Sequence, residues 1–203
     1  AKRGKDVFNN PNQSLFGIVQ GGEYEDLRRH CVEELVKMDF DGYSIGGTSV
    51  GEDKPTQYKM VRYATKYLPE DKVRYLMGVG DPIDIIENVC NGVDIFDCVS
   101  PTRLARHGHA LTRYGKINIK NAKYKSDFTP IEEGCTCYAC QNYTKTYIKH
   151  LINCEETFGA RLLSIHNIHY LINLTEELRT AIKNDSLLAY REEFIKNYYG
   201  ENK

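Results

Sequence analysis

The sequence lacks any long apolar run. No stretch approaches the roughly 20 consecutive apolar residues that a membrane-spanning helix needs. The first residues, AKRGKDVFNNPNQ, also lack the apolar core of a secretory signal peptide. We therefore expect a cytoplasmic protein with no membrane segment.

The sequence also lacks the small size of a disulfide scaffold. Its seven cysteines lie in a chain of 203 residues, and three of them crowd into residues 135–140. Such crowding in a long chain indicates a metal site, so we expect reduced cysteines. Cys31, Cys90 and Cys98 are interpreted as small core residues, although Cys98 is close enough to the candidate site below to line it.

Acidic residues are missing from one stretch. Residues 103–126 contain seven Lys or Arg and two His but no Asp or Glu, although the whole chain has a net charge of -1. A solvated loop is the ordinary explanation of such a charge run. Because Tyr114 and Tyr124 are interleaved with the positive charges, the stretch favours nucleic-acid binding.

Four apolar runs, each followed by glycine or a polar residue and then by a helix-like segment, organise the first half of the chain. The runs cover residues 14–19, 41–45, 74–77 and 93–99. Repeats of roughly 25–30 residues of this kind are typical of parallel βα units. They predict an α/β fold, either half of an eight-unit barrel or a small open sheet.

Sequence patterns also place the helices between these runs. After the first run, Leu27, Cys31, Leu35 and Met38 recur at helical spacing, which predicts that they form the buried face of one helix. Later helices open near Pro55 and Pro82.

In parallel βα architectures the chemistry collects where the strands end. Gln20, Gly47, Met77 and Asp97 each stand at the end of one of the four runs. We therefore expect them on one rim of the fold. Their shared position makes them a candidate site, although none of them forms a motif alone.

Asp97 is the candidate with the most chemistry around it. It ends an apolar run, and Thr102, Arg103, Arg106 and His107 follow it closely. A carboxylate beside cations fits a nucleophile or base acting on a phosphate-bearing substrate. The alternative is that Asp97 merely caps the following turn.

Cys135, Cys137 and Cys140 form a C-x-C-x2-C pattern that suits tetrahedral Zn²⁺ with a structural role. A fourth ligand is needed, and His150, Cys154, His166 and His169 are all available. We choose His166 from its distance along the chain and its helix-like surroundings.

The βα rhythm stops after Pro101. Alternating residues around a turn at Tyr114 and Gly115 predict two short antiparallel strands, and the end of the chain predicts two amphipathic helices broken near Asn184 and Asp185. We expect three parts: βα units in residues 1–101, a zinc-binding insertion with the basic stretch in residues 102–170, and C-terminal helices that pack on the βα units in residues 171–203.

Six segments together resemble the tRNA-guanine transglycosylase (queuine tRNA-ribosyltransferase) family, in the same order and over nearly the whole chain. They are LFGIVQGG, GYSIGGTSVGE, RYLMGVG, GVDIFDCVSPTR, CTCYAC and SIHNIHYL. The resemblance implies the C-terminal half of a TIM (β/α)8 barrel, with half-barrel units in residues 1–101 and a zinc-binding, tRNA-contacting insertion in residues 102–170. It implies a pentosyltransferase that exchanges guanine at the wobble position of a GUN anticodon for a 7-deazaguanine, on the route to queuosine.

The resemblance also implies roles for individual residues. The aspartate that matches Asp97 is the nucleophile, which holds the tRNA as a covalent glycosyl ester. Polar groups at Gln20 and Gly47 contact the base, on which Met77 packs, and Arg103 and Arg106 lie along the tRNA. The zinc ligands match Cys135, Cys137, Cys140 and His166.

The sequence departs from the family at a few positions. Thr48 stands where the bacterial pattern has leucine, which affects whether 7-aminomethyl-7-deazaguanine or queuine fits the base site. His107 stands where asparagine is usual, whereas Val50 matches the bacterial pattern and favours the aminomethyl precursor.

The family's N-terminal half, with its general-base aspartate, has no counterpart in this sequence. We therefore expect this chain to be inactive alone. We expect it to pair with the missing half or to form a homodimer, in which Tyr143, Tyr147 and His150 match interface positions. The alternatives are a non-catalytic tRNA-binding partner subunit and a zinc-stabilised structural module.

Overall fold

The structure is a computed structural model that describes residues 1–48 and 51–200. The chain forms two compact units, Ala1–Cys98 and Val99–Lys203, and each is described by itself.

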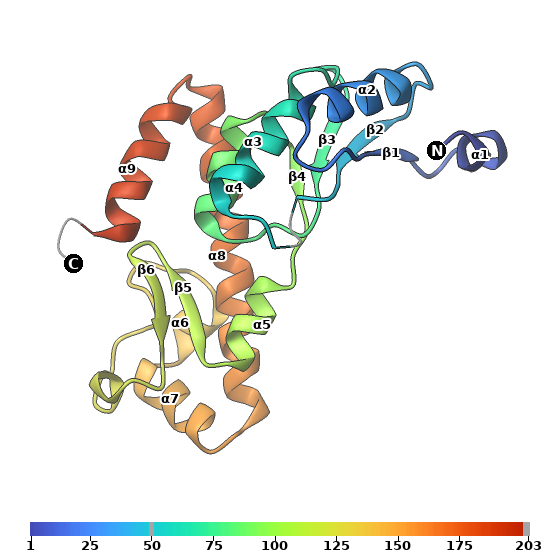
Figure 1. Ribbon diagram of the computed structural model, residues 1–203. Coiled ribbons are helices and arrows are strands. Elements are labelled where there is room, and N and C mark those ends of the chain that lie inside the picture. Colours follow the sequence, from blue (N-terminus) through green and yellow to red (C-terminus); the bar gives the residue numbers. More distant parts are fainter. Residues whose placement is uncertain (49–50, 201–203) are drawn as a thin grey trace. The chain divides into compact units, whose positions relative to one another are not determined.

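The first unit alternates strands and helices (Figure 1). Its elements are α1 (Lys2–Val7), β1 (Phe16–Val19), α2 (Glu25–Val36), β2 (Gly42–Ile45), α3 (Lys54–Thr65), β3 (Val73–Leu76), α4 (Pro82–Cys90) and β4 (Ile95–Phe96). The strands form one parallel sheet in the order β1-β2-β3-β4. The repeated βα pattern of the sequence and the α/β class are thus confirmed.

The fourth strand is shorter than the predicted run over residues 93–99. Its pairing with β3 joins Tyr75 to Ile95 and Leu76 to Phe96 and then stops. Beyond this point the Gly78 N–H donates to the side-chain carboxylate of Asp97, at 2.9 Å. This side chain takes the place of the backbone carbonyl that would continue the pairing of β3 with β4. Asp97 therefore follows the strand directly.

One face of the sheet packs against helices and forms the core of the first unit. Val19, Tyr43, Ile45 and Leu76 point to this face and are almost completely buried. Val32, Leu35, Val61 and Ala64 from α2 and α3 cover them.

The opposite face of the sheet leaves several apolar side chains exposed. The strand register aligns Ile18, Ser44, Tyr75 and Ile95 in one row across all four strands. Ile18 is 46% exposed and Ile95 is 45% exposed, and Val73 on the same face is 40% exposed. Strand residues of this kind are ordinarily covered in a parallel sheet.

The predicted face of helix α2 is confirmed in part. Leu35 is buried and Cys31 and Met38 pack against the core, whereas Leu27 is 50% exposed. Arg28 and Val32 are also buried, and the apolar periodicity misses Arg28 because its side chain is charged. Helices α3 and α4 begin as predicted, with a proline in the first turn of each and an aspartate as N-cap, Asp53 and Asp81 respectively.

The second unit contains a hairpin and several helices (Figure 1). Its elements are α5 (Ser100–Arg106), β5 (His109–Thr112), β6 (Gly115–Asn118), the 3₁₀ helix η1 (Ala122–Tyr124), α6 (Tyr138–Asn142), α7 (Lys145–Asn153), α8 (Thr157–Lys183) and α9 (Leu187–Tyr199). The strands β5 and β6 are antiparallel, as predicted, but their turn lies at Arg113 and Tyr114.

Helix α8 organises the second unit. It continues without a break through residues 170 and 171, and the predicted interruption before α9 occurs at Asn184 and Asp185. Leu162 and Leu163 of α8 are fully buried in the core of this unit with Ala110, Ile119 and Ile148.

A buried amide on α8 connects three segments. The Oδ1 atom of Asn167 accepts from the Leu111 N–H at 2.9 Å. Its Nδ2 atom donates to the carbonyl oxygens of Pro101 at 3.0 Å and His109 at 3.1 Å. Asn167 is 0% exposed, so these bonds satisfy polar groups that water cannot reach.

Among residues 1–48 and 51–200, no helix is both long and apolar enough to cross a membrane.

Candidate active site and metal centre

Asp97 lies exposed at the end of β4, where the sheet stops. Its Oδ1 atom accepts two hydrogen bonds, from the Tyr75 hydroxyl at 2.6 Å and from the Gly78 N–H at 2.9 Å. The bond from Tyr75 and then the bond from Gly78 lower the pKa of Asp97 below its ordinary value. The carboxylate is therefore charged and held in one orientation.

Tyr75 is a site residue that the sequence analysis missed. It lies inside β3, one residue before the strand ends, and its ring belongs to the exposed face of the sheet. The hydrogen bond to Asp97 raises the pKa of Tyr75, so the phenol keeps its proton. No local pattern marks it, because the register that pairs Tyr75 with Ile95, two residues before Asp97, is decided by the tertiary structure.

Gln20 and Gly47 come together at the ends of β1 and β2. A Cβ atom built on Gly47 would lie 2.8 Å from Gln20 Oε1, and one built on Gly46 would lie 2.6 Å from Gln20 Nε2. The backbone of Gly47 has a φ of +62°, which glycine adopts without strain. The Gln20 amide thus lies directly against a glycine pair.

Met77 follows β3 immediately and is 37% exposed. It stands two residues after Tyr75 and beside Gly78, the two donors to Asp97. The loop that holds Asp97 therefore carries Met77 as well. Cys98 is half-buried next to Asp97.

Thr48 is buried, with 2% exposure. Its carbonyl oxygen accepts a hydrogen bond of 2.8 Å from Gln57 Nε2, whereas its hydroxyl has no partner among the described residues. A hydroxyl in this state can donate to a bound molecule. Val50 lies outside the described residues.

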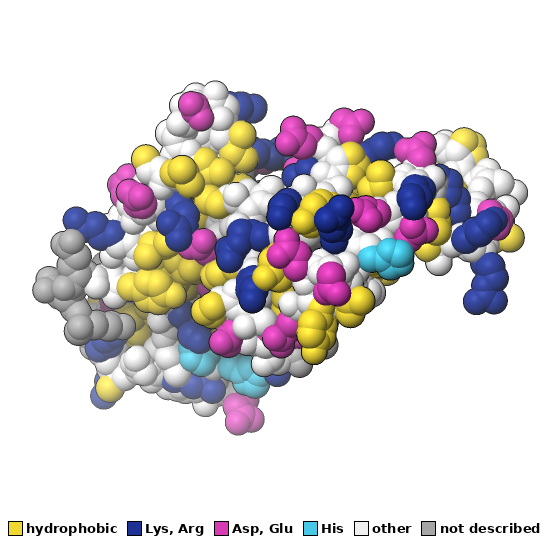
Figure 2. Space-filling view, turned by 45° about the horizontal axis from the view of Figure 1, so that its top comes forward, with side chains coloured by type: hydrophobic (Ala, Val, Ile, Leu, Met, Phe, Trp, Pro, Cys, Tyr) yellow, Lys and Arg dark blue, Asp and Glu magenta, His cyan; other side chains and the backbone are white. Residues whose placement is uncertain are grey.

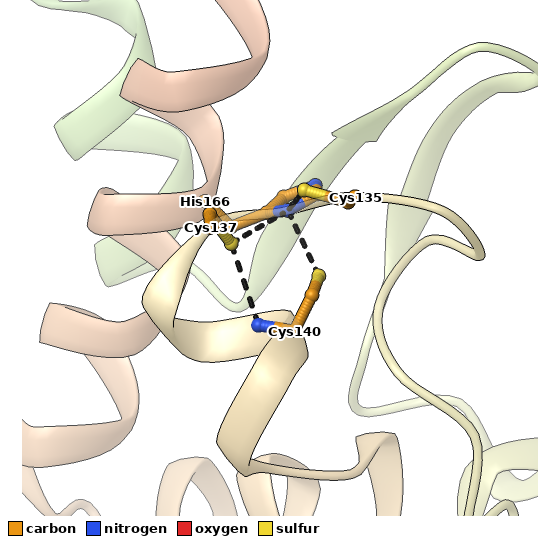
Figure 3. Close-up of side chains that lie close together, drawn as sticks. All are labelled: Cys135, Cys137, Cys140 and His166. Atoms are coloured by element: carbon orange, nitrogen blue, oxygen red, sulfur yellow. Dashed lines mark hydrogen bonds between the residues drawn. The ribbon is translucent and has the colours of Figure 1, made fainter.

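The second unit brings Cys135, Cys137, Cys140 and His166 together (Figure 3). Their ligand atoms all lie within 4.8 Å of one another. The three Sγ atoms lie 3.6, 3.7 and 3.4 Å from Nδ1 of His166. Tetrahedral zinc with ordinary Zn–S and Zn–N bonds separates sulfur and nitrogen by about 3.6 Å, so the four residues fit the ion.

The surroundings of His166 orient its ring for metal binding. His166 is 0% exposed, and its Nε2–H donates to the Leu111 carbonyl at 2.8 Å. This bond leaves Nδ1 as the free nitrogen that faces the thiols. The other candidate ligands lie elsewhere: His169 contacts Thr136 and Asn173, and His150 contacts Cys154.

The thiols of the cluster affect one another's protonation. The hydrogen bond between Cys137 and Cys140 lowers the pKa of Cys137 and raises the pKa of Cys140. Burial disfavours the charged form of His166, but its contacts with Cys135, Cys137 and the Leu111 carbonyl prevail and raise its pKa to about 9. This accumulation of proton-binding groups at one point is typical of metal ligands.

The basic residues after Asp97 belong to the second unit. Arg103 and Arg106 are exposed in the last turn of the short helix α5. Further along the stretch, Arg113 pairs with Glu177 of α8. On the face drawn in Figure 2, Lys and Arg side chains are interspersed with Asp and Glu side chains.

Comparison with known proteins adds to this geometry. Residues 1–200 match the family described as queuine tRNA-ribosyltransferase. The chain is 55% identical over 199 residues to the queuine tRNA-ribosyltransferase of Macrococcus caseolyticus, and 55% identical over 201 residues to that of Caldanaerobacter subterraneus subsp. tengcongensis. The matches cover 98% of this chain but 52% and 54% of these relatives.

The chain thus spans about half the length of the curated relatives that it matches. The match nevertheless includes both units, with Asp97 and the four-residue metal cluster inside it. The chain belongs to the queuine tRNA-ribosyltransferase family.

Proposed function

We propose that the protein containing this chain is a pentosyltransferase that exchanges guanine at the wobble position of tRNA for a 7-deazaguanine. The observation that carries the proposal is the Asp97 carboxylate, held through Oδ1 by Tyr75 and Gly78 at the strand ends. Because both of these bonds end on Oδ1, the Oδ2 atom is left to attack. The names of the relatives support a ribosyl transfer to tRNA.

The reaction proceeds in two displacements on one sugar carbon. Oδ2 of Asp97 attacks the anomeric carbon of the ribose, and the bond from that carbon to N9 of guanine breaks. Guanine leaves with the electron pair and takes up a proton. The incoming base then loses its N9 proton, attacks the same carbon and releases the carboxylate, so the charge on Asp97 is restored.

The exposed parts of the sheet support a half barrel that needs further residues. The exposed row with Ile18 and Ile95 and the unpaired edges of β1 and β4 are features that a closed barrel covers. The relatives are about twice as long as this chain. We infer that the missing four strands complete the barrel and bring the general base that handles the N9 proton.

The base site follows from the grouping at the strand ends. The Gln20 amide can donate to and accept from a purine edge, and Gly47 lets the backbone approach it closely. Met77 supplies an apolar surface for the face of the base. The free Thr48 hydroxyl adds a polar group next to Gly47, which bears on the choice between queuine and 7-aminomethyl-7-deazaguanine.

The remaining roles follow from the second unit. Arg103 and Arg106, exposed on α5, are proposed to contact phosphates of an anticodon loop with a GUN anticodon while the target base is flipped out. When bound, zinc would supply a structural cross-link, because it would tie Cys135 and Cys137 before α6 and Cys140 within α6 to His166 of α8.

A homodimer contact is proposed on α7. Tyr143 and Tyr147 stack with their ring centroids 5.5 Å apart, and Tyr147 and His150 are exposed on the same helix. Local packing is the alternative, since Tyr143 also contacts Phe158 at 5.5 Å. Mass measurement at several concentrations decides between them.

The test uses a completed protein, in which this chain is joined to the N-terminal part of the Macrococcus caseolyticus relative that precedes the matched region. It is incubated with a GUN-anticodon tRNA and a guanine analogue that has carbon in place of N9. This analogue fills the base site but cannot displace the ester. We expect a slower band on a denaturing gel, lost in Asp97→Asn and kept in the control Asp71→Asn, which changes an exposed aspartate.

The alternatives give different results. Full exchange by Asp97→Asn would move the assignment to a non-catalytic tRNA-binding subunit. No band and no exchange by the completed protein would favour a structural zinc module. The chain alone is expected to be inactive, because its nucleophile lacks the general base, and guanine exchange by the 203-residue chain would contradict that.

The cytoplasmic location stays a prediction.

A further inference from the structure

A fully buried arginine lies behind the Gln20 and Gly47 loops. Arg28 of α2 is 0% exposed, which is unusual for a charged side chain. Burial lowers the pKa of its guanidinium, whereas the neighbouring Cys31 and Glu52 oppose that change. A buried guanidinium is tolerated only where its N–H groups find acceptors, so its contacts show what holds it in place.

The Arg28 guanidinium binds the backbone of two different loops. Nε donates to the Gly22 carbonyl at 2.7 Å, in the loop between β1 and α2. Nη1 and Nη2 both donate to the Gly46 carbonyl at 3.3 Å, and Nη2 donates to the Gly47 carbonyl at 3.2 Å, in the loop between β2 and α3. One side chain therefore joins the loops that follow the first two strands.

These bonds determine the orientation of the peptide groups at Gly46 and Gly47. The described chain contains no cis peptide, so each N–H points opposite to the carbonyl of the preceding residue. With the Gly46 carbonyl bound to Arg28, the Gly47 N–H points away from the guanidinium. Among the described residues this N–H has no hydrogen-bond partner, so it is available to a ligand.

Gln20 belongs to the same assembly. Its amide lies against Gly46 and Gly47, and it is followed directly by Gly21, where a Cβ atom would lie 2.6 Å from the Arg28 backbone nitrogen. The Gln20 N–H also donates to the thiol of Cys31, which lies one turn after Arg28 on α2, at 3.4 Å. Both groups assigned to the base are thus supported by α2.

We propose that Arg28 is a positioning residue for the base site, which holds the Gln20 and Gly47 loops in the geometry that accepts a purine edge. The proposal rests on the proposed function, in which these two residues contact the base. A planar guanidinium reaches three carbonyl oxygens at once, whereas an ammonium is a single point charge. A lysine at position 28 would keep the positive charge but would not replace these contacts.

The experiment measures exchange of labelled guanine into tRNA by the completed protein and by its Arg28→Lys and Arg28→Gln variants. The matched control is Arg29→Lys, which changes the next residue of α2, an exposed arginine paired with Glu33. We expect KM for guanine to rise about tenfold or more in both Arg28 variants, because small misplacements of binding groups are costly. We expect kcat and KM for tRNA to stay within about threefold of the parent.

A double variant separates positioning from general stability. Because Arg28 holds the Gln20 loop as well as the Gly47 loop, the increases in KM for guanine caused by Arg28→Lys and Gln20→Ala should be less than additive in the double variant. A general loss of structure would instead add its effect to that of Gln20→Ala and would lower the melting temperature.

Three results would overturn the proposal: an unchanged KM for guanine, a parallel loss of all kinetic parameters with a lower melting temperature, or failure of both Arg28 variants to fold. Failure of the proposed function is visible separately, because the parent completed protein would then form no covalent band and exchange no guanine. That result would remove the base site and the role of Arg28 with it.

Discussion

The hydroxyl of Tyr75 donates a hydrogen bond of 2.6 Å to Oδ1 of Asp97. Tyr75 lies on β3, whereas Asp97 follows β4, and the strand register brings the two side chains to the same face of the sheet. The contact orients the carboxylate and keeps it charged. It should therefore affect how the reaction and the stability of the fold depend on pH.

Tyr75→Phe should shift the pH dependence of the reaction. The bond from Tyr75 is the largest cause of the lowered pKa of Asp97, so the variant should raise that pKa towards its ordinary value. The acid limb of covalent band formation should then move to higher pH. Tyr63→Phe, on α3, is the control. An acid limb that stays in place would contradict the assigned contact.

The same change has a defined sign for stability. A lowered folded-state pKa means that Asp97 stabilises the fold above its unfolded pKa, and that this contribution is lost as the pH falls through the folded value. In Tyr75→Phe the pKa of Asp97 should differ less between the folded and unfolded states, so the free energy of unfolding should fall less as the pH is lowered. Urea unfolding at several acidic pH values measures this.

Loss of one thiol should release the metal. Cys137 is 3% exposed and lies 3.7 Å from Nδ1 of His166, so Cys137→Ser should reduce bound zinc from one equivalent to nearly none. A loss of about 3 kcal/mol would lower the melting temperature by roughly 6–12 °C. Elemental analysis and calorimetry measure both effects. Cys154→Ser, at an exposed cysteine, should change neither.

A buried carboxylate connects α3 with α4. The Tyr58 hydroxyl donates to Asp84 at 2.7 Å, and Lys54 pairs with the other oxygen. Tyr58→Phe should cost about 1.5–3 kcal/mol, because it removes a hydrogen bond to a charged group that is 4% exposed. Denaturant unfolding measures the loss. Tyr63→Phe on the same helix should stay within about 0.5 kcal/mol of the parent.

Asn167→Ala should destabilise the second unit. The change leaves one N–H and two carbonyl groups without their partner in a region from which water is excluded. We expect a loss of about 3 kcal/mol, measured by denaturant unfolding. Asn173→Ala, on an exposed part of the same helix, is the control. Equal losses in the two variants would show that the buried amide has no special role.

Much of the fold could be predicted from local patterns. Prolines marked the starts of α3 and α4, and alternating residues predicted the β5–β6 hairpin. Helix α2 was placed correctly and Leu35 is buried as predicted, but Leu27 is exposed, and Arg28 occupies a core position that periodicity assigns to apolar residues. The length of β4 was also wrong, because Asp97 replaces a backbone acceptor.

The sequence by itself determined the βα repeats, the thiol cluster at residues 135–140 and the position of Asp97 at a strand end, since these depend on neighbouring residues. The tertiary structure decided which atoms meet. Tyr75 contacts Asp97 across 22 residues, and His166 faces the thiols across 26 or more. Arg28 reaches the Gly46 carbonyl across 18 residues. Such contacts arise from strand register and helix packing, which bring together side chains that no local pattern relates.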